Sequence, residues 1–373
     1  MTIIYFLIML GVLIAIHEAG HMLTAKLFNI YVREFAIGFG PVIWKKQGRE
    51  TLYSIRAIPL GGFTGMIESE EENVAQKVLE GGQEVAENDS EASEERKPVI
   101  EESRTFYGAH PLKRIAVLLA GPLANLLLAV FVFMNIFIYN GYDVVYPKAV
   151  VESVLPGSAA QEAGVQAGDE IIFITYGNGD RVHITSTYDV TVNNEMHKGE
   201  MTVTVLRGEK TYDMKITPRY DAESDRYLMG VMFGGEMQQV KLTLGQAMAR
   251  GFTYTFEMIG MTVRSVWLLI TGQIGMESMS GTIGIYTYTE EAVQYGFISY
   301  LSLVGSISVS LGIMNLIPIP VFDGGRIVMT VIEMIIGHRL SQKFEQAVLT
   351  VGLVLILLLF ILVTYFDITK LFK

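Results

Sequence analysis

The sequence predicts a polytopic α-helical membrane protein with about four transmembrane helices, a membrane-associated β-hairpin-like loop and an inserted α/β domain. Half of the 373 residues are hydrophobic and only 18% are charged, which is typical of a chain with several apolar spans. Four long apolar runs are each long enough to cross a bilayer. Between the second and third runs lies a segment rich in turn signals and short strand patterns, which predicts a folded insertion.

The first span is predicted at residues 3–28. Its apolar run begins without a Lys or Arg and is longer than a hydrocarbon core of about 30 Å requires. We therefore expect an uncleaved membrane helix rather than a secretory signal. The second span, at residues 112–140, completes an N-terminal membrane part, residues 1–141. The third and fourth spans, at residues 297–317 and 347–366, form a C-terminal membrane part, residues 297–373.

Two segments of different character separate the first two spans. Residues 30–66 contain short alternating runs broken by Gly and Pro, which predicts a strand-rich cytoplasmic loop close to the membrane. Residues 67–103 form an acidic insert, with 13 acidic and 3 basic residues between Glu68 and Glu102. This insert accounts for nearly all of the net charge of −11. The chain has no basic cluster, so no nucleic-acid partner is expected.

The insertion after the second span is predicted as a folded domain at residues 145–235, followed by an amphipathic, interfacial helix at 242–275. The loops after spans one and three carry most of the Lys and Arg residues that flank the spans. By the positive-inside rule these loops are cytoplasmic, which places the domain at 145–235 outside the cytoplasm. We therefore expect a multi-pass protein of the plasma membrane or inner membrane.

The first span contains the sequence "HEAGH", which fits the pattern H-E-x-x-H. On a helix, His17 and His21 lie one turn apart and can face the same metal, and Glu18 can reach a water beside that metal. Ionisable residues inside a membrane helix are costly and usually functional. Because the chain has no cysteine, any metal must be held by His, Asp or Glu.

A catalytic zinc site uses three protein ligands and leaves one position open. The third ligand is expected from "NLIPIPVFDGG", residues 315–325, in which Asp323 follows two prolines just beyond the third span. Proline breaks at membrane depth occur where protein or a water-filled cavity satisfies the freed backbone groups. A carboxylate after such a break is well suited to reach a buried metal.

Together, "HEAGH", "GFGP" (residues 38–41), "GPLAN" (121–125) and "NLIPIPVFDGG" make the chain similar to the site-2 protease family. That family comprises intramembrane zinc metalloproteases. The resemblance implies His17, His21 and Asp323 as zinc ligands and Glu18 as the catalytic residue. It also implies that Asn315 and Asn125 hold substrate or polarise its carbonyl. One departure is Thr282, which stands where the family often has Pro before "IGI".

The domain at 145–235 resembles a PDZ domain of the bacterial protease type, because "VLPGSAAQEAGVQAGDEIIFI" combines a small-residue helix with a following A-G-D. PDZ domains bind extended peptides as an added strand, so a peptide ligand is one expectation and a ligand-free steric cap is the other. The expected substrates are single-span membrane proteins: regulators or the remnants of signal peptides. The lipid bilayer is the remaining partner.

Two other classes of protein remain as alternatives at this point. A membrane metal transporter would also place His and Asp within spans, but it would not need Glu18 or a PDZ-like domain. An inactive scaffold would bind peptides through the PDZ-like domain alone. The presence of all three ligands together with Glu18 favours regulated intramembrane proteolysis over both.

Overall fold

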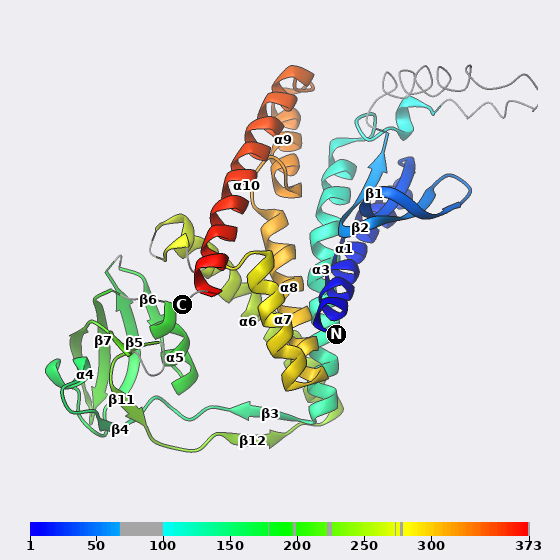
Figure 1. Ribbon diagram of the computed structural model, residues 1–373. Coiled ribbons are helices and arrows are strands. Elements are labelled where there is room, and N and C mark those ends of the chain that lie inside the picture. The colour runs from blue at the N-terminus through cyan, green and yellow to red at the C-terminus, as the bar shows by residue number, and fades with distance from the viewer. Residues whose placement is uncertain are drawn as a thin grey trace, which may run out of the picture. The chain divides into compact units, whose positions relative to one another are not determined.

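The computed structural model describes residues 1–67, 100–177, 179–196, 199–221, 226–272, 274–276 and 279–371. Nearly all of the acidic insert predicted at residues 67–103 therefore lies outside the described residues. The chain forms two compact units. The first comprises residues 1–136, 251–265 and 277–373, and the second comprises residues 137–250 and 266–276 (Figure 1).

Four helices in the described residues are long and apolar enough to cross a membrane. They are α1 (Thr2–Leu27), α3 (Pro111–Asn140), α8 (Phe297–Leu316) and α10 (Gln342–Leu371). This agrees with the four predicted spans. The last helix extends several residues beyond both predicted ends of residues 347–366, because polar residues flank its apolar centre without breaking the helix.

Small residues let these helices approach one another closely, as expected in lipid. A Cβ at Gly20 of α1 would overlap the Ala120 carbonyl of α3, and a Cβ at Gly305 of α8 would press on the Phe133 ring of α3. Large side chains fill the remaining space. A buried cluster joins α1 to α8 through Phe6, Met9, Leu13, Tyr300 and Val304.

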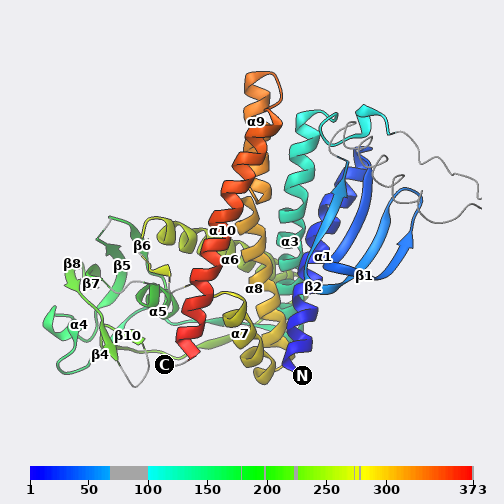
Figure 2. The same ribbon diagram turned by 45° about the horizontal axis from the view of Figure 1, so that its top comes forward.

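The predicted strand-rich loop is one antiparallel hairpin of β1 (Val32–Gln47) and β2 (Leu52–Met66). The hairpin lies along α1, as the ribbon views in Figure 1 and Figure 2 show. We expected short runs broken by Gly and Pro. The strands instead run through these residues, because register shifts at Phe39 and Val42 accommodate the irregular backbone and glycine supplies the positive φ of 91° at Gly38.

An ion pair across the hairpin holds its two strands together. Arg56 Nη2 of β2 lies 2.8 Å from Glu34 Oε1 of β1, and the Ser54 hydroxyl donates to the same oxygen at 2.6 Å. Burial raises the pKa of Glu34, but the hydrogen bonds from Ser54 and Arg56 outweigh it and hold the pKa below its usual value. Glu34 is therefore ionised at neutral pH.

Two further helices of this unit were not expected from the sequence, α7 (Thr282–Tyr295) and α9 (Asp323–Ile336). The start of α7 is held by Asp367 of α10, whose Oδ2 accepts hydrogen bonds from the Gly281 and Gly284 amides at 3.0 and 2.9 Å. Thr282 is the first residue of α7. Proline is favoured at this position, so threonine here is compatible with the same local structure.

The second unit contains a four-stranded antiparallel sheet in the order β6-β5-β7-β8. These strands are β5 (Glu170–Tyr176), β6 (Arg181–His183), β7 (Met201–Arg207) and β8 (Lys210–Ile216). Two helices, α4 (Ala159–Glu162) and α5 (Thr187–Met196), lie within the same segment. One buried cluster includes Ala160, Ile174, Val190 and Val203, so this segment has a hydrophobic core of its own.

Shorter strand pairs complete the second unit. They are β4 (Val151–Val154) with β11 (Val231–Phe233), β9 (Arg219–Asp221) with β10 (Arg226–Leu228), and β3 (Tyr142–Val145) with β12 (Gln238–Lys241). After β12, helix α6 (Leu244–Ile270) begins with a capping box between Thr243 and Gln246. This helix occupies most of the amphipathic segment expected at residues 242–275.

Candidate metal centre

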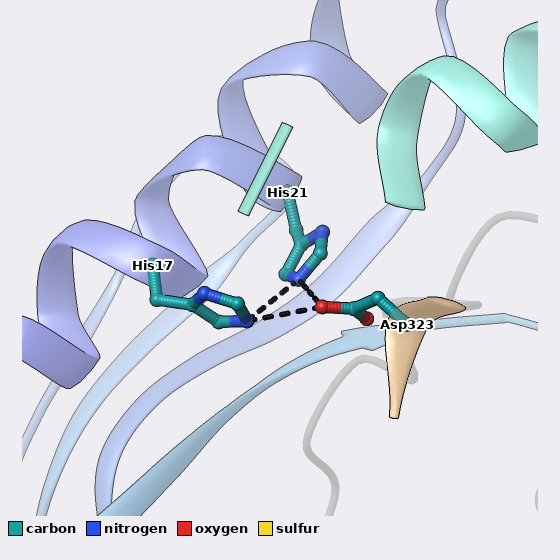
Figure 3. Close-up of side chains that lie close together, drawn as sticks. All are labelled: His17, His21 and Asp323. Atoms are coloured by element: carbon teal, nitrogen blue, oxygen red, sulfur yellow. Dashed lines mark hydrogen bonds and ion pairs between the residues drawn. The ribbon is translucent and has the colours of Figure 1, made fainter. Parts of the chain in front are cut away.

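Two histidines of α1 and an aspartate at the start of α9 converge in the first unit (Figure 3). The Nε2 atoms of His17 and His21 are 3.2 Å apart. Asp323 Oδ2 lies 3.2 Å from His17 Nε2 and 3.4 Å from His21 Nε2. All three side chains are largely buried, with 8 to 16% of each exposed. The four-residue spacing of the histidines along α1 and the non-helical segment between α8 and α9 thus bring the three ligand atoms together.

The distances among these atoms fit a tetrahedral metal. Ligands bound at zinc distances of 2.0–2.1 Å would lie about 3.3 Å from one another in a tetrahedron. The observed separations of 3.2, 3.2 and 3.4 Å match one face of it. The three atoms are two imidazole nitrogens and a carboxylate oxygen, a set that suits zinc. His17, His21 and Asp323 can therefore hold zinc and leave a fourth position open.

Helix α3 packs against both histidines. His21 Nδ1 lies 2.8 Å from the Val117 carbonyl oxygen. Because this oxygen can only accept, it fixes the proton on Nδ1 and leaves Nε2 free to bind a metal. Gly121 makes the close approach possible, since a Cβ there would overlap the imidazole of His21 and press on that of His17. This is the physical reason for a glycine at the start of "GPLAN".

The two asparagines expected near the site lie on opposite sides of His17. Asn125 Nδ2 of α3 is 3.4 Å from His17 Nδ1. Asn315 Nδ2 of α8 is 3.5 Å from His17 Nε2, the nitrogen that faces Asp323. Asn315 is therefore beside the ligand atoms, whereas Asn125 is behind the imidazole ring.

Glu18 lines the same cavity as the three ligand residues, and this cavity has a volume of about 550 Å³. Strand β2 forms one wall of it. The Thr64 hydroxyl donates to the Glu18 backbone carbonyl at 2.9 Å, and a Cβ at Gly62 would overlap the Ala36 carbonyl and an Ile14 methyl. The glycine thus lets the strand lie directly against α1 beside Glu18. The cavity is large enough for a short extended segment of another chain.

Several cavity residues were not identified from the sequence. Thr64 lines the cavity and its hydroxyl donates to the Glu18 backbone carbonyl, while Val117 lies outside the lining and its backbone carbonyl accepts from His21. In both contacts the acceptor is a backbone carbonyl, which leaves no signal in a sequence. Arg326 lies one turn after Asp323 and lines the cavity. Its position in "DGGR" was a usable signal, because a residue three positions after a ligand on a helix faces the same side.

Four membrane-length helices and a buried His–His–Asp cluster beside a glutamate define a class of protein, a metal-dependent peptidase embedded in a membrane. Comparisons with known proteins give the family. The model of peptidase family M50 matches residues 5–359. The chain therefore belongs to peptidase family M50.

Several curated relatives are similar to this chain over nearly their whole length. Zinc metalloprotease RasP of Oceanobacillus iheyensis is 29% identical over 100% of this chain and 99% of its own. A putative zinc metalloprotease of Clostridium acetobutylicum is 31% identical over 98% of this chain and 97% of its own. The regulator of sigma-W protease RasP of Bacillus subtilis is 30% identical over 100% of this chain and 99% of its own. The chain is a zinc metalloprotease of the site-2 protease type and a multi-pass membrane protein.

Proposed function

We propose that this zinc metalloprotease cleaves peptide bonds within or near the transmembrane segments of single-span membrane proteins, with His17, His21 and Asp323 as the zinc ligands and Glu18 as the general base. One observation carries the assignment of residues. The three ligand atoms lie 3.2 to 3.4 Å from one another, and Glu18 opens into the same cavity. No other group of three metal-ligand side chains converges in this way among the described residues.

His17, His21 and Asp323 would hold zinc, which would lower the pKa of a bound water toward neutrality and polarise a carbonyl oxygen. The Glu18 carboxylate accepts a proton as water attacks the scissile carbonyl and returns that proton to the leaving amine. The Asn315 amide, beside the ligand atoms, donates to the carbonyl oxygen as negative charge develops on it. His17, His21 and Asp323 do not exchange protons with the substrate in this scheme.

Strand β2 supports the choice of an extended substrate. A helical substrate has its carbonyls hydrogen-bonded within the helix, so it must unwind before attack. Residues 61–66 of β2 line the cavity that contains Glu18. An unwound segment can add to such a strand through backbone hydrogen bonds, which are independent of its side chains. Single-span regulators and remnants of signal peptides are the substrates proposed.

The orientation proposed follows the distribution of Lys and Arg. The hairpin of β1 and β2 carries Lys45, Lys46 and Arg49 near its turn, which places it in the cytoplasm. Cleavage then releases a cytoplasmic fragment. Residues 145–235 are proposed as an extracytoplasmic PDZ-like domain that binds a peptide of the substrate or limits access to the membrane part.

The test is Glu18→Gln, which keeps the shape of the side chain and removes the base. Cleavage of a single-span substrate by the full-length protein in detergent with zinc is expected to fall by about 10²- to 10⁴-fold, while bound zinc stays near one per chain. Unchanged cleavage would reject Glu18 as the base. Zinc flux into proteoliposomes that survives the substitution would favour a transporter, and absence of bound zinc would favour a scaffold.

A further inference from the structure

The ring nitrogen of His17 that faces away from Asp323 has an incomplete hydrogen bond. His17 Nδ1 lies 3.4 Å from the side-chain nitrogen of Asn125. Asn125 is only 1% exposed. Its Oδ1 is buried and has no hydrogen-bond partner in the described part of the chain. A buried amide oxygen without a donor is energetically unfavourable, so a group that donates to it is expected nearby.

The chemistry of a metal-bound imidazole supplies that donor. When Nε2 of a neutral histidine binds a metal, the ring proton is on Nδ1, and this N–H needs an acceptor. The nitrogen of the Asn125 amide is itself a donor and cannot accept it. A half-turn of the amide about its Cβ–Cγ bond exchanges the positions of its oxygen and nitrogen. Asn125 Oδ1 then accepts from His17 Nδ1–H.

The neighbouring histidine already has this arrangement. His21 Nδ1 donates to the Val117 carbonyl at 2.8 Å. On α3, Val117, Gly121 and Asn125 follow one another at intervals of four residues and share one face. His17 and His21 have the same interval on α1. Two successive turns of α3 therefore provide one acceptor for each histidine, and Gly121 between them provides the space.

We propose that Asn125 is a positioning residue, which accepts a hydrogen bond from His17 Nδ1–H and holds His17 Nε2 toward the zinc. The inference rests on the zinc site of the proposed function. It replaces the substrate-binding or oxyanion role expected for Asn125 from the sequence. Both asparagines line the cavity, but Asn315 lies beside the His17 nitrogen that faces Asp323, whereas Asn125 contacts the opposite nitrogen of the ring.

The experiment measures the affinity of the full-length protein for zinc in detergent, by competition with a chelator. Asn125→Leu has a similar volume and no acceptor, and it is expected to weaken zinc binding by about 10- to 100-fold, as for other losses of a histidine's outer partner. Asn125→Asp keeps an acceptor in the same shape and is expected to bind zinc at least as tightly as the wild type. Asn135→Leu is the matched control, because Asn135 is exposed on α3 and its side chain donates to the Phe131 carbonyl of the same helix; the zinc affinity of this variant should not change.

Two results would overturn the proposal. One is wild-type zinc affinity in Asn125→Leu together with slower turnover, which would show that Asn125 acts on the substrate and not on His17. The other is zinc binding as weak in Asn125→Asp as in Asn125→Leu, and this isosteric variant decides the matter if the leucine variant does not fold. His17→Ala separates this inference from the zinc site itself. If His17→Ala binds zinc like the wild type, the ligand assignment fails; if it loses zinc and Asn125→Leu does not, only the role of Asn125 fails.

Discussion

Two aspartates, one in each unit of the chain, differ in what surrounds their carboxylates; Asp169 is fully buried and Asp323 is largely buried. Asp323 faces two imidazole nitrogens, His17 Nε2 and His21 Nε2, at 3.2 and 3.4 Å. Asp169 faces a guanidinium: Arg207 Nε and Nη2 donate to its two oxygens at 2.6 and 2.7 Å, and the Gln166 amide adds a third hydrogen bond at 2.9 Å. In both cases the protein surrounds a carboxylate with partners, but the partners are imidazoles in one case and a guanidinium in the other.

The carboxylate of Asp169 accepts from a guanidinium and a backbone amide, whereas the carboxylate of Asp323 lies against two imidazole nitrogens. Arg207 carries five N–H groups and a permanent positive charge, so the ion pair with Asp169 is complete within the protein. The imidazole nitrogens beside Asp323 are acceptors when neutral, and their opposite nitrogens already face α3. A cluster of acceptors without a cation is completed by a metal ion. The contrast separates a metal site from a structural ion pair without reference to sequence motifs.

Matched substitutions test this contrast and carry the largest expected effect. Asp323→Asn removes a charged ligand and is expected to weaken zinc binding by more than about 100-fold, beyond the effect of losing an outer partner, and to reduce cleavage to background. Asp169→Asn removes the same charge from the second unit and should leave zinc affinity unchanged. Both are measured by chelator competition and by the release of a cytoplasmic fragment from a single-span substrate.

Equal effects of Asp323→Asn and Asp169→Asn on zinc affinity would contradict the distinction between a metal site and a structural ion pair. Zinc affinity that survives in Asp323→Asn would mean that the third ligand lies elsewhere. Weaker zinc binding in Asp169→Asn would mean that the ion pair of the second unit supports the metal site. Circular dichroism of both variants checks that the helices remain folded.

A smaller effect is expected from the glycine that lets α3 meet both histidines. A Cβ in Gly121→Ala overlaps the His21 imidazole. Overpacking a filled site costs about 1–3 kcal/mol. If all of that cost opposes the arrangement of the ligands that binds zinc, zinc affinity decreases by roughly 5- to 150-fold. Gly11→Ala on α1 is the control, because nothing lies within 4 Å of its added Cβ. Equal zinc affinity in the two variants would show that α3 can move away without disturbing the ligands.

The sequence was informative where chemistry is carried by side chains in fixed spacing. The interval between His17 and His21 and the proline break before Asp323 were enough to propose a three-ligand site, and the apolar runs were enough to predict four long helices. The cavity wall was not predictable in the same way. The hydroxyl of Thr64 in that wall donates to a backbone carbonyl of α1, and behind it the backbone carbonyl of Val117 accepts from His21. Both contacts depend on how helices and strands pack, which spacing alone does not determine.

The helices α7 and α9 show the same limit. Both are 14 residues long and lie in stretches where Gly and Pro signal breaks. α7 begins at Thr282 because a distant carboxylate, Asp367, accepts from its first free amides. This contact joins residues more than 80 positions apart, and no local pattern encodes it. The motif that contains Asn125 likewise locates the residue but not the ring nitrogen that it contacts, because the contact with His17 Nδ1 depends on how α1 and α3 pack.

The smallest effect concerns the pH dependence of the Asp169 ion pair. Burial raises the pKa of Asp169, but hydrogen bonds from Arg207 and the Gln166 amide outweigh it, so its pKa lies below the usual value. A depressed carboxyl pKa contributes stability above the ordinary value of about 3.9, and this contribution is lost as the pH falls through the lower, folded-state pKa. Hydrogen exchange of the β5 and β7 amides in the full-length protein should therefore show greater protection in the wild type than in Asp169→Asn at neutral pH. This difference should shrink below about pH 4. A difference that stays constant down to pH 2.5 would mean that Asp169 contributes through its shape, and the distinction drawn between the two aspartates would lose its electrostatic basis.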